Sequence, residues 1–200
     1  MDSNIFYKSY WKYFLELEES LLELQRYINF EKNNWKVYSN EFIKLIEVIG
    51  SEIDVVAKEI VLYKNSQVKS INGISNWGYN IQQLIPDIDT INLNFYSEEI
   101  ITPWKNWKHE KYIDKNGKEG YRLKKGKENP EWWKAYNKVK HERTTITGGK
   151  YNYERANLGN VINALGGLYI LETYFMEELY KQDGIGMEEF GKLFSYRNII

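Results

Sequence analysis

The sequence predicts an all-α fold, a four- to five-helix antiparallel bundle with a small extended or β-hairpin insertion between helices 3 and 4. Several long stretches place apolar residues three and four positions apart, which is the spacing of one helix face. Hydrophobic residues make up 42% and charged residues 28% of the chain, a globular balance. A length of 200 residues suits one domain over residues 1–200.

The first two predicted helices carry the longest apolar stripes. One runs from about residue 5 to 28, with its apolar positions at Phe6, Tyr10, Leu17, Leu21 and Leu24. The other covers about 39–63, with Ser39 or Asn40 as its cap and a nearly unbroken stripe. Gly50 interrupts this second helix and is expected to cost about 1 kcal/mol relative to Ala. A short third helix over about 75–85 ends at Pro86.

The region from about 88 to 129 has a different pattern. INLNFYS and IITPWKNW alternate like strands or carry β-branched residues, and Pro103 is incompatible with a helix interior. KNG and KKGKENP are typical of turns. We therefore expect an extended lobe or small hairpin inserted into the bundle.

Two further helices complete the prediction. Pro130 and Glu131 begin a fourth helix that runs to about Arg143, because Pro suits the first helical position and an acid suits the first turn. The last long helix covers about 153–181, and only Glu172 breaks its apolar stripe. Its glycines and Asn163 form a small-residue face for the close approach of another helix. The tail, 187–200, is expected to form one more short helix.

Composition limits the functional classes. The net charge of −1 gives no global attraction to nucleic acid or anionic membranes, so nucleic-acid binding requires a local basic patch. The chain has no Cys, no HExxH motif and no EF-hand loop, so we expect neither a metal site nor a cofactor. No signal peptide and no apolar run of about 18 residues is recognisable, which predicts a cytoplasmic protein without a membrane partner.

The fourth predicted helix carries a polar patch near its end. Asn137 and His141 are four residues apart and share a face, to which Lys134 also belongs. An imidazole beside an amide and ammonium groups suits phosphate binding or phosphodiester chemistry. The simpler interpretation is a helix-end histidine with a solvated lysine face. Arg143 joins the patch only if the helix frays there.

Three other titratable residues are considered for a functional role. Glu52 and Glu59 flank the apolar stripe of the second helix. One of them could orient His141 across the bundle; the alternative is that both are ordinary charges at the edge of the stripe. His109 lies in a lysine-rich segment, WKNWKHEKY, and is expected to be exposed and uninvolved.

Two segments together resemble a known family. WWKAYNKVKHER (132–143) followed by RANLGNVINALGGL (155–168) resembles a WWxxYNxxKHxR…AxLxNxxxALxxL pattern of HEPN-type proteins. VIGSEIDVVAK (48–58) resembles the second helix of that group, and ITPWKNW its segment before the fourth helix. The resemblance spans roughly residues 42–175.

The HEPN resemblance implies a helical bundle, often dimeric, from toxin–antitoxin or phage-defence systems. Many members are metal-independent endoribonucleases with an R-x4-6-H motif. The family's histidine corresponds to His141 and its preceding polar residue to Asn137. Lys134, Ala135 and Tyr136 occupy the slots of the arginine, so Lys134 or Arg143 is expected to contact phosphate. The predicted catalytic set is His141, Asn137, Lys134 and Arg143, in a homodimer.

The insertion offers an alternative class of partner. It mixes aromatic residues and lysines (Trp104, Trp107, Tyr112, Tyr121; Lys105, Lys108, Lys111, Lys115, Lys124, Lys125, Lys127). Such a mixture suits single-stranded RNA or a nucleotide, and equally a partner or antitoxin protein. The alternative function is therefore a non-catalytic, HEPN-like interaction module.

Overall fold

The computed structural model describes residues 1–200 except 67–70, 72, 97–98, 184–190 and 198–200. Its helices are α1 (Ser3–Phe6), a π-helical turn (Tyr7–Trp11), α2 (Lys12–Glu23), α3 (Asn40–Lys64), α4 (Gly73–Leu84), α5 (Glu131–Glu142) and α6 (Leu158–Asp183). Short 3₁₀ turns cover Leu24–Arg26, Lys32–Asn34, Ile88–Thr90 and Asn152–Arg155. In the described residues, no helix combines the length and apolarity that a bilayer crossing requires.

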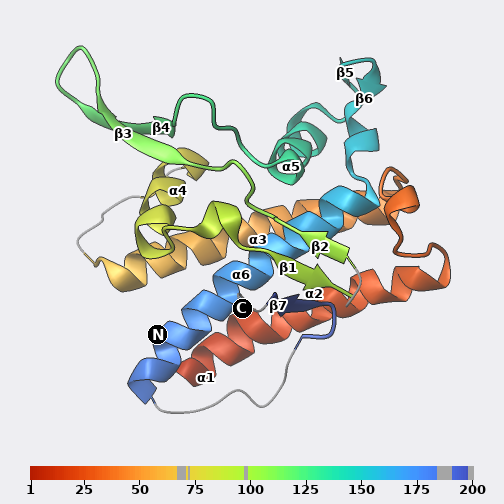
Figure 1. The fold of residues 1–200 in the computed structure, drawn as a ribbon, viewed down its shortest axis with the longest axis horizontal. Coiled ribbons are helices and arrows are strands. Elements are labelled where there is room, and N and C mark those ends of the chain that lie inside the picture. Colours follow the sequence, from red (N-terminus) through yellow and green to blue (C-terminus); the bar gives the residue numbers. More distant parts are fainter. Residues whose placement is uncertain (67–70, 72, 97–98, 184–190, 198–200) are drawn as a thin grey trace.

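The fold is mixed α/β, so the all-α prediction is wrong. The described strands form three antiparallel sheets: β2 (Glu99–Ile101), β1 (Leu93–Phe95) and β7 (Phe194–Tyr196); β3 (His109–Ile113) with β4 (Glu119–Leu123); and β5 (Ile146–Thr147) with β6 (Lys150–Tyr151). The β3–β4 hairpin falls inside the expected insertion and projects from the helices (Figure 1).

The tail supplies a strand where a helix was expected. Leu93 pairs with Ile101 on one side and with Tyr196 on the other, so β1 lies between β2 and β7. The strand was missed for two reasons. A strand of three residues is too short to show the alternation of apolar and polar residues, and the partners β1 and β7 lie about 100 residues apart in the sequence. Residues 191–193 and 197 are not helical either, and the rest of the predicted tail helix, 187–190 and 198–200, lies outside the described residues.

The two longest helices, α3 and α6, run in the same direction. The Leu158 N–H at the start of α6 donates to the Val37 carbonyl just before α3. At the other end, Lys64 of α3 pairs with Glu178 of α6. The helices cross at the centre of the molecule (Figure 1), and α2 runs opposite to α6, since Phe6 contacts Phe175 whereas Phe14 contacts Tyr169. The arrangement is therefore not a simple antiparallel bundle.

The segment expected to be an insertion supplies part of the core. Trp104 and Trp107 are fully buried. Their rings contact each other and the rings of Trp77 on α4 and Trp132 on α5. The indole N–H of Trp132 donates to the Pro103 carbonyl at 2.8 Å. Burying aromatic rings of this size contributes strongly to stability, so residues 102–109 belong to the body of the domain rather than to an appended lobe.

Glycines in the helices make room for these rings. A Cβ atom on Gly50 of α3 would lie 2.5 Å from the Tyr136 ring, and one on Gly78 of α4 would lie 2.6 Å from Trp107. Gly166 and Gly167 of α6 receive the side chains of Ile101, Pro103, Trp104 and Trp132. The small-residue face of α6 therefore receives part of residues 101–104 as well as α5.

We predict that Gly50→Ala destabilises the protein, although Ala is the better helix former. The added methyl group overlaps the buried Tyr136 ring, and such overpacking costs roughly 1–3 kcal/mol. Urea denaturation followed by circular dichroism measures the free energy of unfolding. Ser51→Ala, at the next and exposed position, is the control and should change stability by less than about 0.5 kcal/mol. A stabilised Gly50→Ala variant would contradict the close contact.

Candidate functional site

The polar face of α5 is occupied by bonds within the chain. Lys134 Nζ lies 2.7 Å from Glu128 and 2.6 Å from Glu131. Asn137 donates its side-chain N–H to the Trp133 carbonyl one turn back, at 2.9 Å. Lys134 and His141 are seven residues apart, which separates them by about 10 Å along the helix axis. The patch is therefore extended, and two of its polar groups already have partners.

The end of α5 divides the other two predicted residues. His141 is exposed, whereas Arg143 pairs with Glu47 of α3. Glu52 and Glu59 show no bond to His141 in the described part of the chain; their charges act instead on Tyr10 of the π-helical turn. The grooves of the described structure are therefore not lined by the four predicted residues, His141, Asn137, Lys134 and Arg143.

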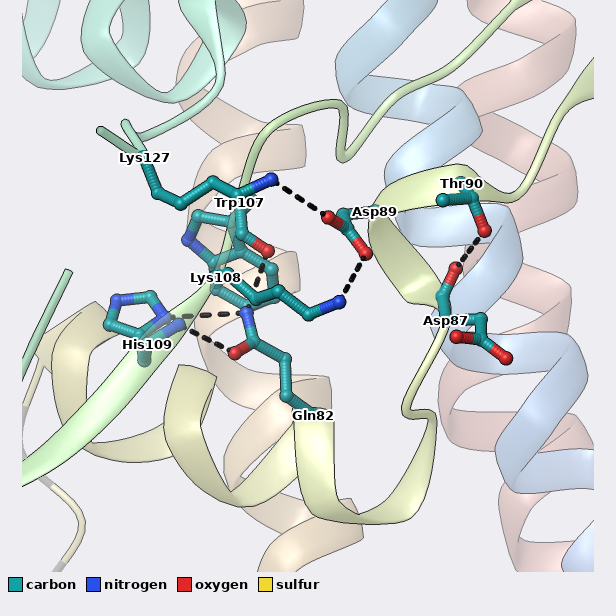
Figure 2. A network of polar contacts seen from close by, with 8 residues as sticks. All are labelled: Gln82, Asp87, Asp89, Thr90, Trp107, Lys108, His109 and Lys127. Carbon is teal, nitrogen blue, oxygen red and sulfur yellow. Dashed lines mark hydrogen bonds and ion pairs between the residues drawn. The ribbon is translucent and has the colours of Figure 1, made fainter. Parts of the chain in front are cut away.

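His109 was expected to be exposed, and this is wrong: the residue is only 7% exposed. Gln82 of α4 accepts the His109 backbone N–H at 2.7 Å and donates to the Trp107 carbonyl at 2.9 Å, as Figure 2 shows. Burial lowers the pKa of His109 to about 4, so the imidazole is neutral at pH 7. The two bonds of Gln82 hold the start of β3 against α4.

A buried aspartate fixes the same region. Asp89, in the 3₁₀ turn before β1, lies between Lys108 and Lys127 at 3.3 and 3.4 Å (Figure 2). Lys111 and Arg122 of the hairpin pair with Glu119 and Glu110. With Trp104 and Trp107 buried as well, much of the aromatic and cationic set of this segment is used in folding.

A polar groove instead lies beside the starts of α5 and α6. One part, of about 510 Å³, lies between the segment before α3 and the start of α6. A second part, of about 230 Å³, lies between residues 102–106 and the start of α5. Glu131, Asn160 and Asn163 line both parts, so the two adjoin along α6. We call this combined feature the polar groove.

The polar groove contains cations that lack an acidic partner. Lys36, Lys105 and Lys150 are exposed and form no ion pair in the part of the chain that the structure describes. Arg155 is held in place by Asn152 and the Thr147 carbonyl, and no carboxylate of the described residues pairs with its guanidinium. Of the three glutamates in the lining, Glu128 and Glu131 share Lys134. The groove is therefore mildly positive in a chain of net charge −1.

Aromatic and amide groups accompany these cations. Trp35 and Tyr38 line the groove, and Tyr38 is 46% exposed. The Tyr38 ring contacts Tyr153, which stacks on Tyr151 with the planes 12° apart. Asn160 and Asn163 donate their side-chain N–H groups to the backbone of residues 155 and 159. Both residues line the groove, and within the described residues their side-chain oxygens accept no hydrogen bond from the chain.

Sequence reasoning missed the polar groove because no local spacing marks it. Lys36, Tyr38 and Lys150 lie in segments predicted to be connections, and Arg155 lies more than 100 residues from Lys36. The parallel course of α3 and α6 brings their starts together, and that course was not predicted. The bond from the Gly159 N–H to the Trp35 carbonyl fixes the contact.

Glu172 of α6 is the most unusual titratable group. It is completely buried, and neither carboxyl oxygen has a hydrogen-bond partner within the described residues. Burial raises its pKa well above the ordinary value, and the charge of Glu52 adds to the effect. A buried carboxyl group without a partner costs stability, most of all when ionised.

No metal site accompanies these acids: in the described residues, no group of three or more His, Asp or Glu side chains is arranged to hold an ion. Comparison with known proteins gives no further guide, since no family model, curated protein or solved structure matches the chain. The HEPN resemblance therefore stays a prediction from the sequence.

We predict that Glu172→Gln raises the free energy of unfolding, and more at about pH 8 than at about pH 5. The folded state retains a proton that the unfolded chain releases near the ordinary pKa, so the wild type loses stability as pH rises above that value. The variant has no such proton. Urea denaturation of both proteins at the two pH values measures the difference, and the contribution of His109 is common to both. An equal change at both pH values would contradict the raised pKa.

Proposed function

We propose that this chain is an RNA-handling protein of the cytoplasm that binds single-stranded RNA in the polar groove. The observation that carries the proposal is a set of cations without an acidic partner in the described part of the chain, Lys36, Lys105, Lys150 and Arg155, beside the exposed ring of Tyr38. Other cations, such as Lys134 and Lys108, are neutralised by acids.

The groups in the groove match the parts of an unpaired nucleotide. Ammonium and guanidinium groups bind backbone phosphates, and the release of counterions from the nucleic acid favours the contact. Bases stack on exposed tyrosine or tryptophan rings. The side-chain oxygens of Asn160 and Asn163 accept hydrogen bonds from base amino groups or a ribose hydroxyl. Double-stranded RNA offers its bases less readily, so single strands are favoured.

Cleavage, if it accompanies binding, is assigned to His141. The end of α5 is joined to the wall of the groove, because Asn152 donates to the Glu142 carbonyl and Tyr153 to the Arg143 carbonyl. The imidazole of His141 is exposed, and histidine is the side chain that most often transfers protons in general acid–base catalysis, here to and from a ribose 2′-hydroxyl. The HEPN resemblance adds the proposal of a homodimer in a toxin–antitoxin or phage-defence system.

The first test measures RNA binding. Fluorescence anisotropy with a labelled single-stranded oligoribonucleotide should show saturable binding that weakens steeply as salt rises from about 50 to about 200 mM. Lys36→Gln with Lys150→Gln should weaken it by about tenfold or more, since each lost phosphate contact removes part of the electrostatic attraction. Tyr38→Ala should cost about 1–3 kcal/mol through lost stacking.

Lys115→Gln, in the exposed turn of the β3–β4 hairpin, is the matched control and should bind like the wild type. Equal losses in the control and in the groove variants would show non-specific attraction and overturn the assignment. Failure of the wild type to bind any single-stranded RNA would do the same.

The second test separates cleavage from binding. In EDTA, the wild type should cleave single-stranded RNA, and His141→Ala should remove at least about 99% of the rate, in line with the usual contribution of general acid–base catalysis. Binding affinity and the circular dichroism spectrum should stay the same, because His141 is exposed and forms no hydrogen bond or ion pair with the described residues. Equal cleavage by both proteins would show that His141 is not the catalytic residue.

A further inference from the structure

A second groove, of about 590 Å³, lies between α2 and α3. Its walls are apolar: Tyr13, Leu17, Leu24 and Tyr27 on one side, and Leu45 and Val48 on the other. Tyr27 is 85% exposed and Val48 is 37% exposed. We call this feature the α2–α3 groove. It is distinct from the polar groove, which is lined by other residues.

The exposed apolar surface continues along α3. Val48, Val55 and Leu62 are each seven residues apart and are all exposed. A seven-residue spacing keeps side chains on nearly the same face of a helix, with a drift of only about 20° per step. A bound helix therefore has an apolar line to follow beyond the groove itself.

The rim of the α2–α3 groove is acidic. Glu23 and Glu41 belong to the lining, and Lys44, the one cation among its described residues, lies 2.7 Å from Glu41. Glu52 follows Val48 by one helical turn and is half-buried. It lies close enough to the groove to act on Tyr13, whose pKa is raised by burial and then by the charge of Glu52.

Glu52 contributes negative charge to this side of the groove. Its charge also acts on the carboxyl group of Glu172 on α6, which is fully buried and has no hydrogen-bond donor in the described part of the chain. Together with Glu23 and Glu41, Glu52 disfavours further negative charge and favours a cation. The groove thus complements an ammonium or guanidinium group on an apolar stem.

We propose that the α2–α3 groove is the docking site for a basic amphipathic helix of a partner protein. Leucine-like side chains at helical spacing fill the space between Leu17 and Val48, as in other helix-in-groove contacts. Lysine or arginine side chains on the flanks meet Glu23, Glu41 and Glu52.

The charge of the rim decides against other occupants. RNA phosphates are repelled by Glu23, Glu41 and Glu52. A second copy of this chain, docked through the same surface about a two-fold axis, would bring each acidic rim toward its own counterpart. A basic helix removes both conflicts and covers the exposed Tyr27 and Val48.

The test uses a fluorescein-labelled peptide of Leu and Lys with about 18 residues, roughly 27 Å of helix, and Leu at i, i+3, i+4 and i+7 spacing. Anisotropy with the full chain should show saturable one-to-one binding. A scrambled peptide of equal composition has no apolar face and should bind at least about tenfold more weakly, which corresponds to about 1.4 kcal/mol. A Leu/Glu peptide of the same pattern should not bind.

Two variants locate the binding surface. Val48→Arg puts a cation into the groove, and Glu52→Gln removes an acid one helical turn away. Each should weaken the binding of the Leu/Lys peptide by about tenfold. The matched controls, Ile113→Arg on the hairpin and Glu31→Gln on a surface turn, replace exposed residues elsewhere and should leave affinity unchanged. RNA binding by Val48→Arg should equal that of the wild type, so this proposal and the RNA proposal fail separately.

Three results would overturn the docking site. If the scrambled peptide bound as tightly as the patterned one, the protein would recognise only the charge of the peptide and not its apolar face. If the Val48→Arg and Glu52→Gln variants bound the peptide as tightly as the wild type, the peptide would bind outside the α2–α3 groove. A dimer of the wild type that Val48→Arg dissociates, together with no peptide binding, would identify a second copy as the occupant.

Discussion

Aromatic rings packed directly onto helix backbones at glycine are the contacts on which the rest of this structure depends. Gly50 receives Tyr136, Gly78 receives Trp107, and Gly167 receives Trp104 and Trp132. These contacts bring α3, α4 and α6 onto α5 and onto the residues that precede it. Without such close approach, the segment between α4 and α5 would have no place in the core. The position of α5, and with it both walls of the polar groove, follows from this packing.

Charge pairing then determines which surfaces remain open to a partner. Several lysines on α5, at Asp89 and on the hairpin pair with acids within the chain. The polar groove keeps cations without such partners, whereas the α2–α3 groove keeps acids. A chain that is nearly neutral overall therefore carries two faces of opposite character, and each favours a different kind of molecule.

Local patterns were enough to locate the long helices, although α6 begins at Leu158 rather than at about 153 and the tail forms β7 instead of a helix. The stripe beginning at Phe42, the cap at Ser39 and the Pro130 start agree with α3 and α5 to within a residue or two. Pairings between distant segments were missed, because neither β1 with β7 nor the parallel course of α3 and α6 leaves a local signal. The chemistry of α5 was visible as a set of residue types, but not the partners of Lys134 and Arg143. The polar groove joins four separate segments, which no spacing in the sequence reveals.

The attachment of β7 has a consequence for how the molecule assembles. The carboxylate of Glu18, on α2, accepts the N–H groups of Lys192 and Leu193, and β7 completes the sheet beside β1. The α2 and β7 regions therefore close on each other across the middle of α6. Leu193 must have left the ribosome before Glu18 meets its donors, so this carboxylate stays hydrated and β1 lacks one edge partner until then.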